Sequence, residues 1–158
     1  MAELRKVAVG GTFDELHRGH KVLLTKAFEV SENVVIGLCS DAFVKKLGKP
    51  HVTASYEARL KELKKFLSIR GLAERAEIVS LNEPFGVAAT DRTIEGLVVS
   101  EETLATANKI NEQREKSALP ALRIFAVNMV RSDNCGPIST TRIRRGEMDR
   151  EGRLLRTR

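Results

Sequence analysis

The chain has 158 residues, of which 42% are hydrophobic, 30% charged and 4% aromatic, with no tryptophan and a formal net charge of +6. This balance is typical of a globular protein that buries its own core, and it excludes a disordered chain. The few aromatic residues argue against a surface that stacks successive bases of single-stranded nucleic acid. No apolar run approaches the roughly 18 residues of a membrane span, and the amino-terminal segment lacks a secretory pattern, so we expect a cytoplasmic protein.

The cysteines and the basic residues are informative through their positions. Cys39 and Cys135 lie far apart without metal-ligand spacing, so we expect two thiols in a reducing compartment. Residues 131–158 hold eight Arg against four acidic residues, and the chain ends in a basic tail, residues 149–158. A basic tail binds nucleic acid by counterion release or attracts polyphosphate metabolites, and composition does not decide between the two.

Apolar and amphipathic segments alternate along the chain. Residues 7–9 predict a first strand that stops at a glycine turn of Gly10 and Gly11. Helical spacing follows over residues 21–29, with Val22, Leu23, Lys26 and Ala27 recurring on one side. The β-branched run 34–39 predicts a strand covered on both faces. Ser55 as a cap and Gly71 as a stop bracket the next helix. Further strands are expected over 77–81, 94–99 and 122–127, and further helices over 101–116 and 139–146.

Strands that alternate with helices indicate β-α-β crossovers and a parallel sheet. We therefore predict one doubly wound, Rossmann-like α/β domain over residues 1–158, with a parallel sheet of about five strands. In such sheets, ligands bind beyond the carboxyl ends of the strands, where helices begin.

The segment after the first strand reads Gly-Gly-Thr-Phe-Asp-Glu-Leu-His-Arg-Gly-His over residues 10–20. It matches neither of the two common phosphate-binding fingerprints. Glycines nevertheless let backbone N–H groups approach a phosphate, and a helix amino terminus favours negative charge. His17 and His20 offer donors, and Gly19 leaves space between them. The alternative is a plain turn with polar surface histidines. A zinc site does not fit, because Asp14 alone adds too few ligands.

A second motif, Ile-Ser-Thr-Thr-Arg-Ile-Arg over residues 138–144, follows the last expected strand. Its hydroxyls suit a helix cap, which is one reading. In the other reading, the hydroxyls of residues 139–141 and the Arg142 guanidinium hold the β- and γ-phosphates of a nucleotide.

Together the two motifs resemble the signatures of the nucleotidyltransferase superfamily that includes phosphopantetheine and nicotinamide-mononucleotide adenylyltransferases and choline-phosphate cytidylyltransferases. The run Val-Val-Ser-Glu-Glu-Thr at 98–103, followed by Asn108, Ile110-Asn111 and Arg114, is similar to the archaeal and eukaryotic type of phosphopantetheine adenylyltransferase. Residues 55–59 and 84–91 extend that similarity. The chain lacks the Arg-Thr-Glu-Gly of cytidylyltransferases before the second motif, and it lacks the Arg-rich segment of the bacterial adenylyltransferases.

The resemblance implies a set of site residues. It places ATP at Gly11, Thr12, Phe13, His17, Gly19, His20, Ser100, Glu101, Glu102, Ser139, Thr140, Thr141, Arg142 and Arg144. It places the acceptor at Thr12, Lys45, Lys46 and Phe85, and the catalytic groups at His17, His20, Lys45 and Lys46. His20 is implied as the main transition-state stabiliser. Which lysine contacts the acceptor phosphate is open, and a solvated basic loop is the alternative.

The implied reaction transfers the adenylyl group of ATP to 4'-phosphopantetheine, giving dephospho-coenzyme A and pyrophosphate. Magnesium is expected with ATP, and no resident metal site is expected. The expected partners are these small molecules, without nucleic acid or membrane; the oligomeric state is open, with a monomer favoured. One alternative is a superfamily enzyme acting on nicotinamide mononucleotide, a flavin or a phospho-alcohol. The other is a nucleic-acid-binding module, which the interspersed acidic residues and the missing aromatic partners disfavour.

Overall fold

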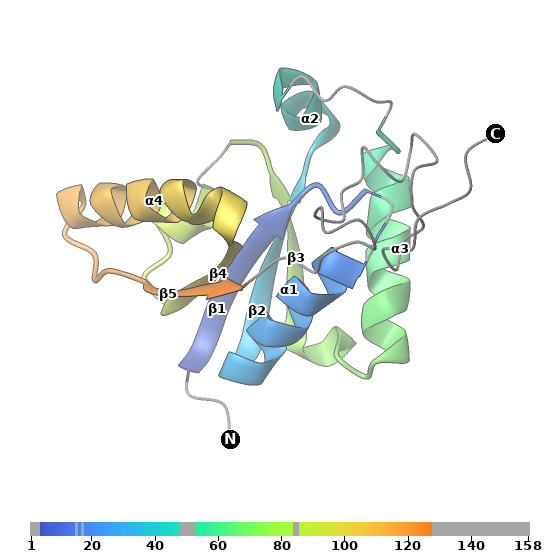
Figure 1. Cartoon of the computed structure of the whole chain (residues 1–158), viewed down its shortest axis with the longest axis horizontal. Coiled ribbons are helices and arrows are strands. Elements are labelled where there is room, and N and C mark those ends of the chain that lie inside the picture. Colours follow the sequence, from blue (N-terminus) through green and yellow to red (C-terminus); the bar gives the residue numbers. More distant parts are fainter. Residues whose placement is uncertain (1–3, 15, 17, 48–52, 84–85, 128–158) are drawn as a thin grey trace.

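A computed structural model describes residues 4–14, 16, 18–47, 53–83 and 86–127 (Figure 1). The strands are β1 (Leu4–Gly11), β2 (Ser31–Cys39), β3 (Ala76–Leu81), β4 (Gly96–Ser100) and β5 (Arg123–Val127). The α-helices are α1 (Arg18–Val30), α2 (Asp41–Leu47), α3 (Tyr56–Ile69) and α4 (Leu104–Lys116). Three 3₁₀ turns are η1 (Ala73–Arg75), η2 (Gly86–Ala89) and η3 (Glu101–Thr103).

The strands form one parallel sheet in the order β3-β2-β1-β4-β5. The chain winds outward from β1 to β3 on one side and from β4 to β5 on the other. The direction of winding therefore reverses between β1 and β4, which pair through Val7–Gly96 and Ala8–Leu97. This confirms the predicted doubly wound α/β fold. It also places the switch point, where such sheets bind ligands, beside the end of β1.

Alternate residues of the strands enter two cores on opposite faces of the sheet. Val7 and Val9 of β1 face α1 and α3 and join their buried side chains, among them Leu24 and Phe66. Ala8 faces the other way, toward the core that η2 and α4 cover. Figure 1 shows α1 and α3 on one side of the sheet and α4 on the other. The period-2 alternation of a strand explains this division.

Several predicted elements are confirmed, with identifiable local causes. The β2 residues 34–39 are all buried, as expected for a strand covered on both faces. The Ser55 hydroxyl caps α3 by accepting a hydrogen bond from the Ala58 N–H at 3.2 Å. Gly71, with φ of +70°, ends that helix in the left-handed conformation that favours glycine. The two long helices α1 and α4 lie close to the expected positions.

Two local predictions are wrong. First, β1 continues through Gly10 and Gly11, and neither glycine has a positive φ, so the turn begins one step later. Second, the side predicted for α1 is wrong in part. Ala27 is buried and Leu23 packs against the core, but Val22 and Lys26 are only half-buried, and Leu24 and Phe28 are buried instead.

The segment that carries Lys45 and Lys46 after β2 is a short helix, α2, and not the loop that the family resemblance and its alternative both implied. The Ser40 hydroxyl accepts the Phe43 N–H at 3.1 Å near the start of this helix. Phe43 and Val44 then pack on Cys39 and Leu81 in a small third core. A helix of seven residues makes only about two turns, which is too short for a helical period to be identified from sequence.

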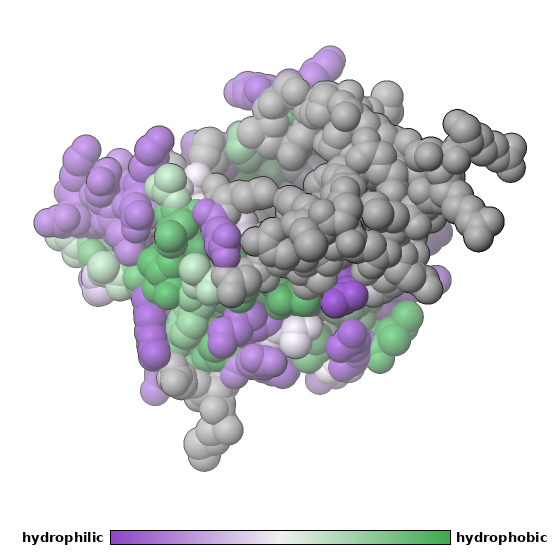
Figure 2. Space-filling view, viewed as in Figure 1, coloured by the Kyte–Doolittle hydropathy of each residue, from purple (hydrophilic) through white to green (hydrophobic). Residues whose placement is uncertain are grey.

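The surface of α4 is mostly polar. Figure 2 shows hydrophilic side chains gathered over α4, whose buried residues are few. Cys39 carries a buried thiol, as predicted. Within the described ranges, no helix is both long enough and apolar enough to cross a membrane. The predicted helix 139–146, the tail 149–158 and Cys135 lie outside the described residues.

Candidate active site

The carboxyl ends of β1, β2 and β4 meet at one edge of the sheet, near α2 in Figure 1. β1 leads through Thr12 and Phe13 to α1, β2 leads to α2, and β4 leads through η3 to α4. Backbone that leaves adjacent parallel strands at one edge is the usual ligand site of this fold.

The backbone at Phe13 has an unusual conformation. Its φ is +50°, in the left-handed region, and its side chain is 1% exposed. The ring lies over Gly11, where an added Cβ would lie 3.3 Å from a ring carbon. A non-glycine residue held in this region costs on the order of 1 kcal/mol, and burial of the ring offsets that cost. A side chain at position 11 would therefore crowd the Phe13 ring, which gives a structural reason for glycine beside the predicted approach of a phosphate.

His20 lies in the first turn of α1, beside this fixed backbone. Its half-buried ring meets the Phe13 ring edge-to-face, with 5.3 Å between centroids and 66° between planes. The first turn of α1 holds no acidic residue of its own, and the Glu62 carboxylate of α3 accepts the Leu16 N–H at 2.9 Å just before the helix begins. The predicted juxtaposition of glycine segment, helix start and His20 is present. His17 lies outside the described residues.

Lys45 and Lys46 lie in the last turn of α2 and are both exposed. The helix that carries them starts directly after β2, so they stand on the same edge of the sheet as Thr12. Their exposure leaves them available to an anion, and the choice between them stays open. The residue Phe85 predicted for the acceptor lies outside the described residues.

Ser100 is the last residue of β4 and is 7% exposed. Its N–H donates to the Thr103 hydroxyl at 3.1 Å, and the two hydroxyls lie 3.3 Å apart. These bonds form a capping box that starts η3 and α4, which gives Ser100 a structural function. Glu101 is exposed, and the Glu102 side chain lies outside the described residues.

Sequence reasoning missed Arg59 and the structural use of Asp14. Arg59 is 2% exposed and donates hydrogen bonds to the carbonyls of Thr12, Cys39 and Ala54. Asp14 is 1% exposed and accepts the Ala54 N–H at 3.2 Å. The sequence does contain one indication that Arg59 is buried. Arg59 precedes the buried residues 63 and 66 by four and seven positions, which places it on the same face of the helix.

Two residues that carried the resemblance prove to be structural. Arg114 is 1% exposed and donates to the carbonyls of Ala88, Asp91, Ile94 and Pro120. Burial lowers the pKa of its guanidinium, and the carboxylate of Asp91 opposes that shift. Asn111, its neighbour on α4, exchanges two hydrogen bonds with the backbone of residue 122 at 2.7 and 3.1 Å. Both fasten α4 to the segments that lead into β4 and β5, away from the carboxyl ends of the strands.

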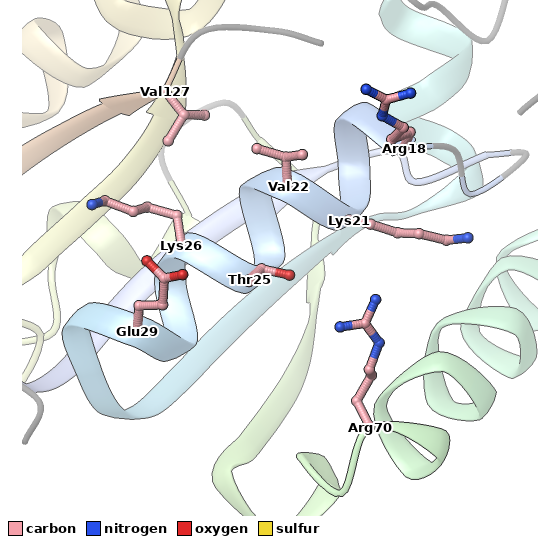
Figure 3. Close-up of a pocket in the computed structure, with 8 residues that line it drawn as sticks. All are labelled: Arg18, Lys21, Val22, Thr25, Lys26, Glu29, Arg70 and Val127. Carbon is pink, nitrogen blue, oxygen red and sulfur yellow. The ribbon is translucent and has the colours of Figure 1, made fainter. Parts of the chain in front are cut away.

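A pocket of about 390 Å³ lies along the outer side of α1 (Figure 3). It is predominantly basic and is lined by Arg18, Lys21, Val22, Thr25, Lys26, Glu29, Arg70 and Val127. None of the predicted site residues lines it, so it is not the predicted site. Among the residues that the structure describes, no group of three or more His, Cys, Asp or Glu is placed to hold a metal ion. The predicted phosphate residues Ser139, Thr140, Thr141, Arg142 and Arg144 lie beyond the described part.

Comparison with known proteins identifies the family. The cytidylyltransferase-like family model matches residues 8–146. A phosphopantetheine adenylyltransferase of Methanopyrus kandleri is 41% identical over 94% of this chain and 94% of its own length. That of Pyrococcus abyssi is also 41% identical, over 99% of both chains. A crystal structure of an Archaeoglobus fulgidus protein of unknown function has a TM-score of 0.67 and 32% identity, covering 78% of this chain and 98% of that chain. The chain therefore belongs to the cytidylyltransferase-like family and, within it, to the family of the archaeal phosphopantetheine adenylyltransferases.

Proposed function

We propose that this chain transfers the adenylyl group of ATP to 4'-phosphopantetheine, giving dephospho-coenzyme A and pyrophosphate in coenzyme A biosynthesis. The observation that carries the proposal is the similarity to archaeal phosphopantetheine adenylyltransferases over nearly the whole chain. The fold supports it, because a parallel sheet with a helix amino terminus after its central strand is a common phosphate-binding arrangement.

The proposed reaction needs no nucleophilic side chain. An oxygen of the acceptor's phosphate forms a bond to the α-phosphorus of ATP. The bond from that phosphorus to the oxygen shared with the β-phosphate breaks, and pyrophosphate leaves with the electron pair. Enzymes accelerate such transfers by aligning the two reactants and by stabilising charge on the phosphate oxygens.

On the nucleotide side, we assign the main charge stabilisation to His20. Its imidazole stands at the positive end of α1, so the side chain and the helix dipole both favour negative charge on the transferring phosphate. The backbone at Thr12 and Phe13 would face the same phosphates, and Gly19 leaves room beside the ring. His17 and residues 139–144 are assigned to the triphosphate by motif alone.

On the acceptor side, we assign the phosphate of 4'-phosphopantetheine to Lys45 or Lys46, with Thr12 between the two substrates. Both lysines are exposed at the strand-end edge. A long, mostly uncharged pantetheine arm requires an apolar wall, for which Phe85 is the candidate. Magnesium would enter as part of the nucleotide substrate, held by phosphates and water.

The test is pyrophosphate release by the purified chain with magnesium and a matrix of triphosphates and acceptors. ATP with 4'-phosphopantetheine should exceed ATP with nicotinamide mononucleotide, and CTP with any phospho-alcohol, by at least about 100-fold in kcat/KM. That ratio needs only about 2.7 kcal/mol of differential transition-state binding. The His20→Ala variant, purified in parallel, controls for a contaminating host enzyme. If another pair is preferred, the family assignment stands and the substrate assignment is wrong.

Three further expectations stay predictions. They are a cytoplasmic location, a monomer and the absence of a nucleic-acid partner. The last would be wrong if the purified chain shifted nucleic acid in a gel at physiological ionic strength, with the steep salt dependence of phosphate contacts.

A further inference from the structure

The Arg59 guanidinium joins backbone that leaves two neighbouring strands. One nitrogen, Nη1, donates to the Thr12 carbonyl at 2.9 Å and to the Cys39 carbonyl at 2.8 Å. Nε donates to the Ala54 carbonyl at 2.9 Å, and Nη2 lies 3.1 Å from the Asp41 carboxylate. With a side chain 1% exposed, the guanidinium is surrounded by protein, and each of its three nitrogens has an acceptor.

Three of these four acceptors border a part of the proposed site. Thr12 is the first residue past β1 and precedes Phe13, whose φ is +50°. Cys39 ends β2, and Asp41 begins α2. A single planar group therefore fixes the nucleotide-binding backbone relative to the helix that carries Lys45 and Lys46. The guanidinium is rigid and planar, so it sets both the distance and the angle between the backbone after β1 and the start of α2. A flexible ammonium group does not set both.

The Asp41 carboxylate extends this connection. The same Oδ1 that pairs with Arg59 accepts the Tyr56 N–H at 2.8 Å. It thereby ties the start of α2 to the start of α3. The Asp41 side chain is 64% exposed, so the ion pair itself contributes little to stability. The carbonyl bonds to Thr12 and Cys39 hold the guanidinium in place, and the Asp41 bond passes that position on to α2.

We propose that Arg59 is a positioning residue for adenylyl transfer, which sets the alignment of the ATP half of the site with the acceptor half. It contacts neither substrate and acts through Thr12 and α2. The proposal rests on the proposed function. Because each half of the site stays intact when Arg59 is altered, both substrates should still bind. The in-line approach of the two phosphates should suffer, and this loss appears in kcat.

A second arginine provides a matched control. Arg75 also donates to three backbone carbonyls, those of Phe28, Ser31 and Glu32, at 2.7, 2.7 and 2.9 Å. These carbonyls join the end of α1 to the start of β2, at the opposite edge of the sheet from the proposed site. Replacing Arg75 therefore removes the same kind of hydrogen bond without touching the strand ends that Arg59 connects.

The experiment compares Arg59→Lys with Arg75→Lys in steady-state kinetics and thermal unfolding. We expect Arg59→Lys to lower kcat by about 10- to 100-fold, since small misplacements of reacting groups have effects of this size. Both KM values should change by less than about threefold, and Arg75→Lys should keep kcat within about twofold. Wild-type kcat in Arg59→Lys, or an equal loss in Arg75→Lys at matched folded fraction, overturns the proposal.

A second variant covers the case in which Arg59→Lys does not fold. Asp41→Asn keeps an oxygen for the Tyr56 N–H but removes the charge that faces Arg59. It should lower kcat by about three- to tenfold with KM values nearly unchanged, and unchanged kcat would refute the proposal. If the wild-type chain prefers another substrate pair, the substrate assignment fails separately. The same comparison of variants is then made with that pair.

Discussion

Replacing His20 separates its chemical function from its packing. The His20→Ala change removes the imidazole donors and also the edge-to-face contact with Phe13, at 5.3 Å between centroids. Loss of one preorganised donor to a developing oxyanion lowers kcat by about 10²–10³, or about 2.7–4 kcal/mol. Loss of an aromatic pair costs about 0.5–1.5 kcal/mol of stability. For a chain of this size, that corresponds to a fall in Tm of roughly 1–6 °C.

The matched variant is His20→Phe, which keeps a flat ring against Phe13 and lacks both nitrogens. We expect it to unfold within about 2 °C of the wild-type Tm, since packing is retained. Its kcat should nevertheless be as low as that of His20→Ala. The assay is pyrophosphate release at saturating ATP and acceptor, with Tm measured by circular dichroism on the same samples. If His20→Phe retains wild-type kcat, the imidazole takes no part in the chemistry and the ring serves only as packing.

Three further changes test other parts of the molecule. Arg142→Ala should raise the KM for ATP by about tenfold and more than that for the acceptor, as expected for a charged phosphate contact; an effect on the acceptor alone would contradict its assignment. Of Lys45→Ala and Lys46→Ala, one should raise the KM for 4'-phosphopantetheine by about tenfold, and the assignment fails if neither does. Thr93→Val removes the hydroxyl that chiefly lowers the pKa of Asp91. A carboxyl group whose pKa is lower in the folded than in the unfolded protein stabilises the fold at pH values above its unfolded pKa. That stabilisation is lost as the pH falls through the folded pKa. The variant should therefore lose about 1 kcal/mol of unfolding free energy at pH 7, and this loss should shrink as the pH falls below 3.8, the ordinary pKa of the carboxyl. Urea titrations at pH 7 and at several pH values below 3.8 measure the change; a loss that does not depend on pH would contradict this reasoning.

Local patterns were sufficient to predict most of the fold. The β-branched run of β2 reads as a buried strand because both faces are covered, and Ser55 and Gly71 mark the ends of α3 through bonds within one turn. The errors arose where the decisive contact was not local. β1 runs through its glycines because Gly10 and Gly11 pair with Gly37 and Leu38 of β2. α2 packs Phe43 and Val44 against Leu81 of β3, a contact distant in sequence.

The same division applies to the site. The positions of Thr12, His20 and the two lysines at one edge of the sheet followed from motif order and from the topology of parallel sheets. The network of Arg59 did not, because it joins residues 47 and 20 positions apart in the sequence. A lone arginine in an amphipathic helix carries no signal of which carbonyls it will meet.

The central position of β1 has a consequence for synthesis and folding. β1 obtains one neighbour, β2, within its first crossover, but its other neighbour, β4, begins only at Gly96. Until the ribosome has released β4, one side of β1 lacks its partner strand. An unpaired strand edge invites association with other chains. Fragments that end before residue 96 should therefore aggregate, whereas the longer chain pairs both sides of β1 within its own sheet.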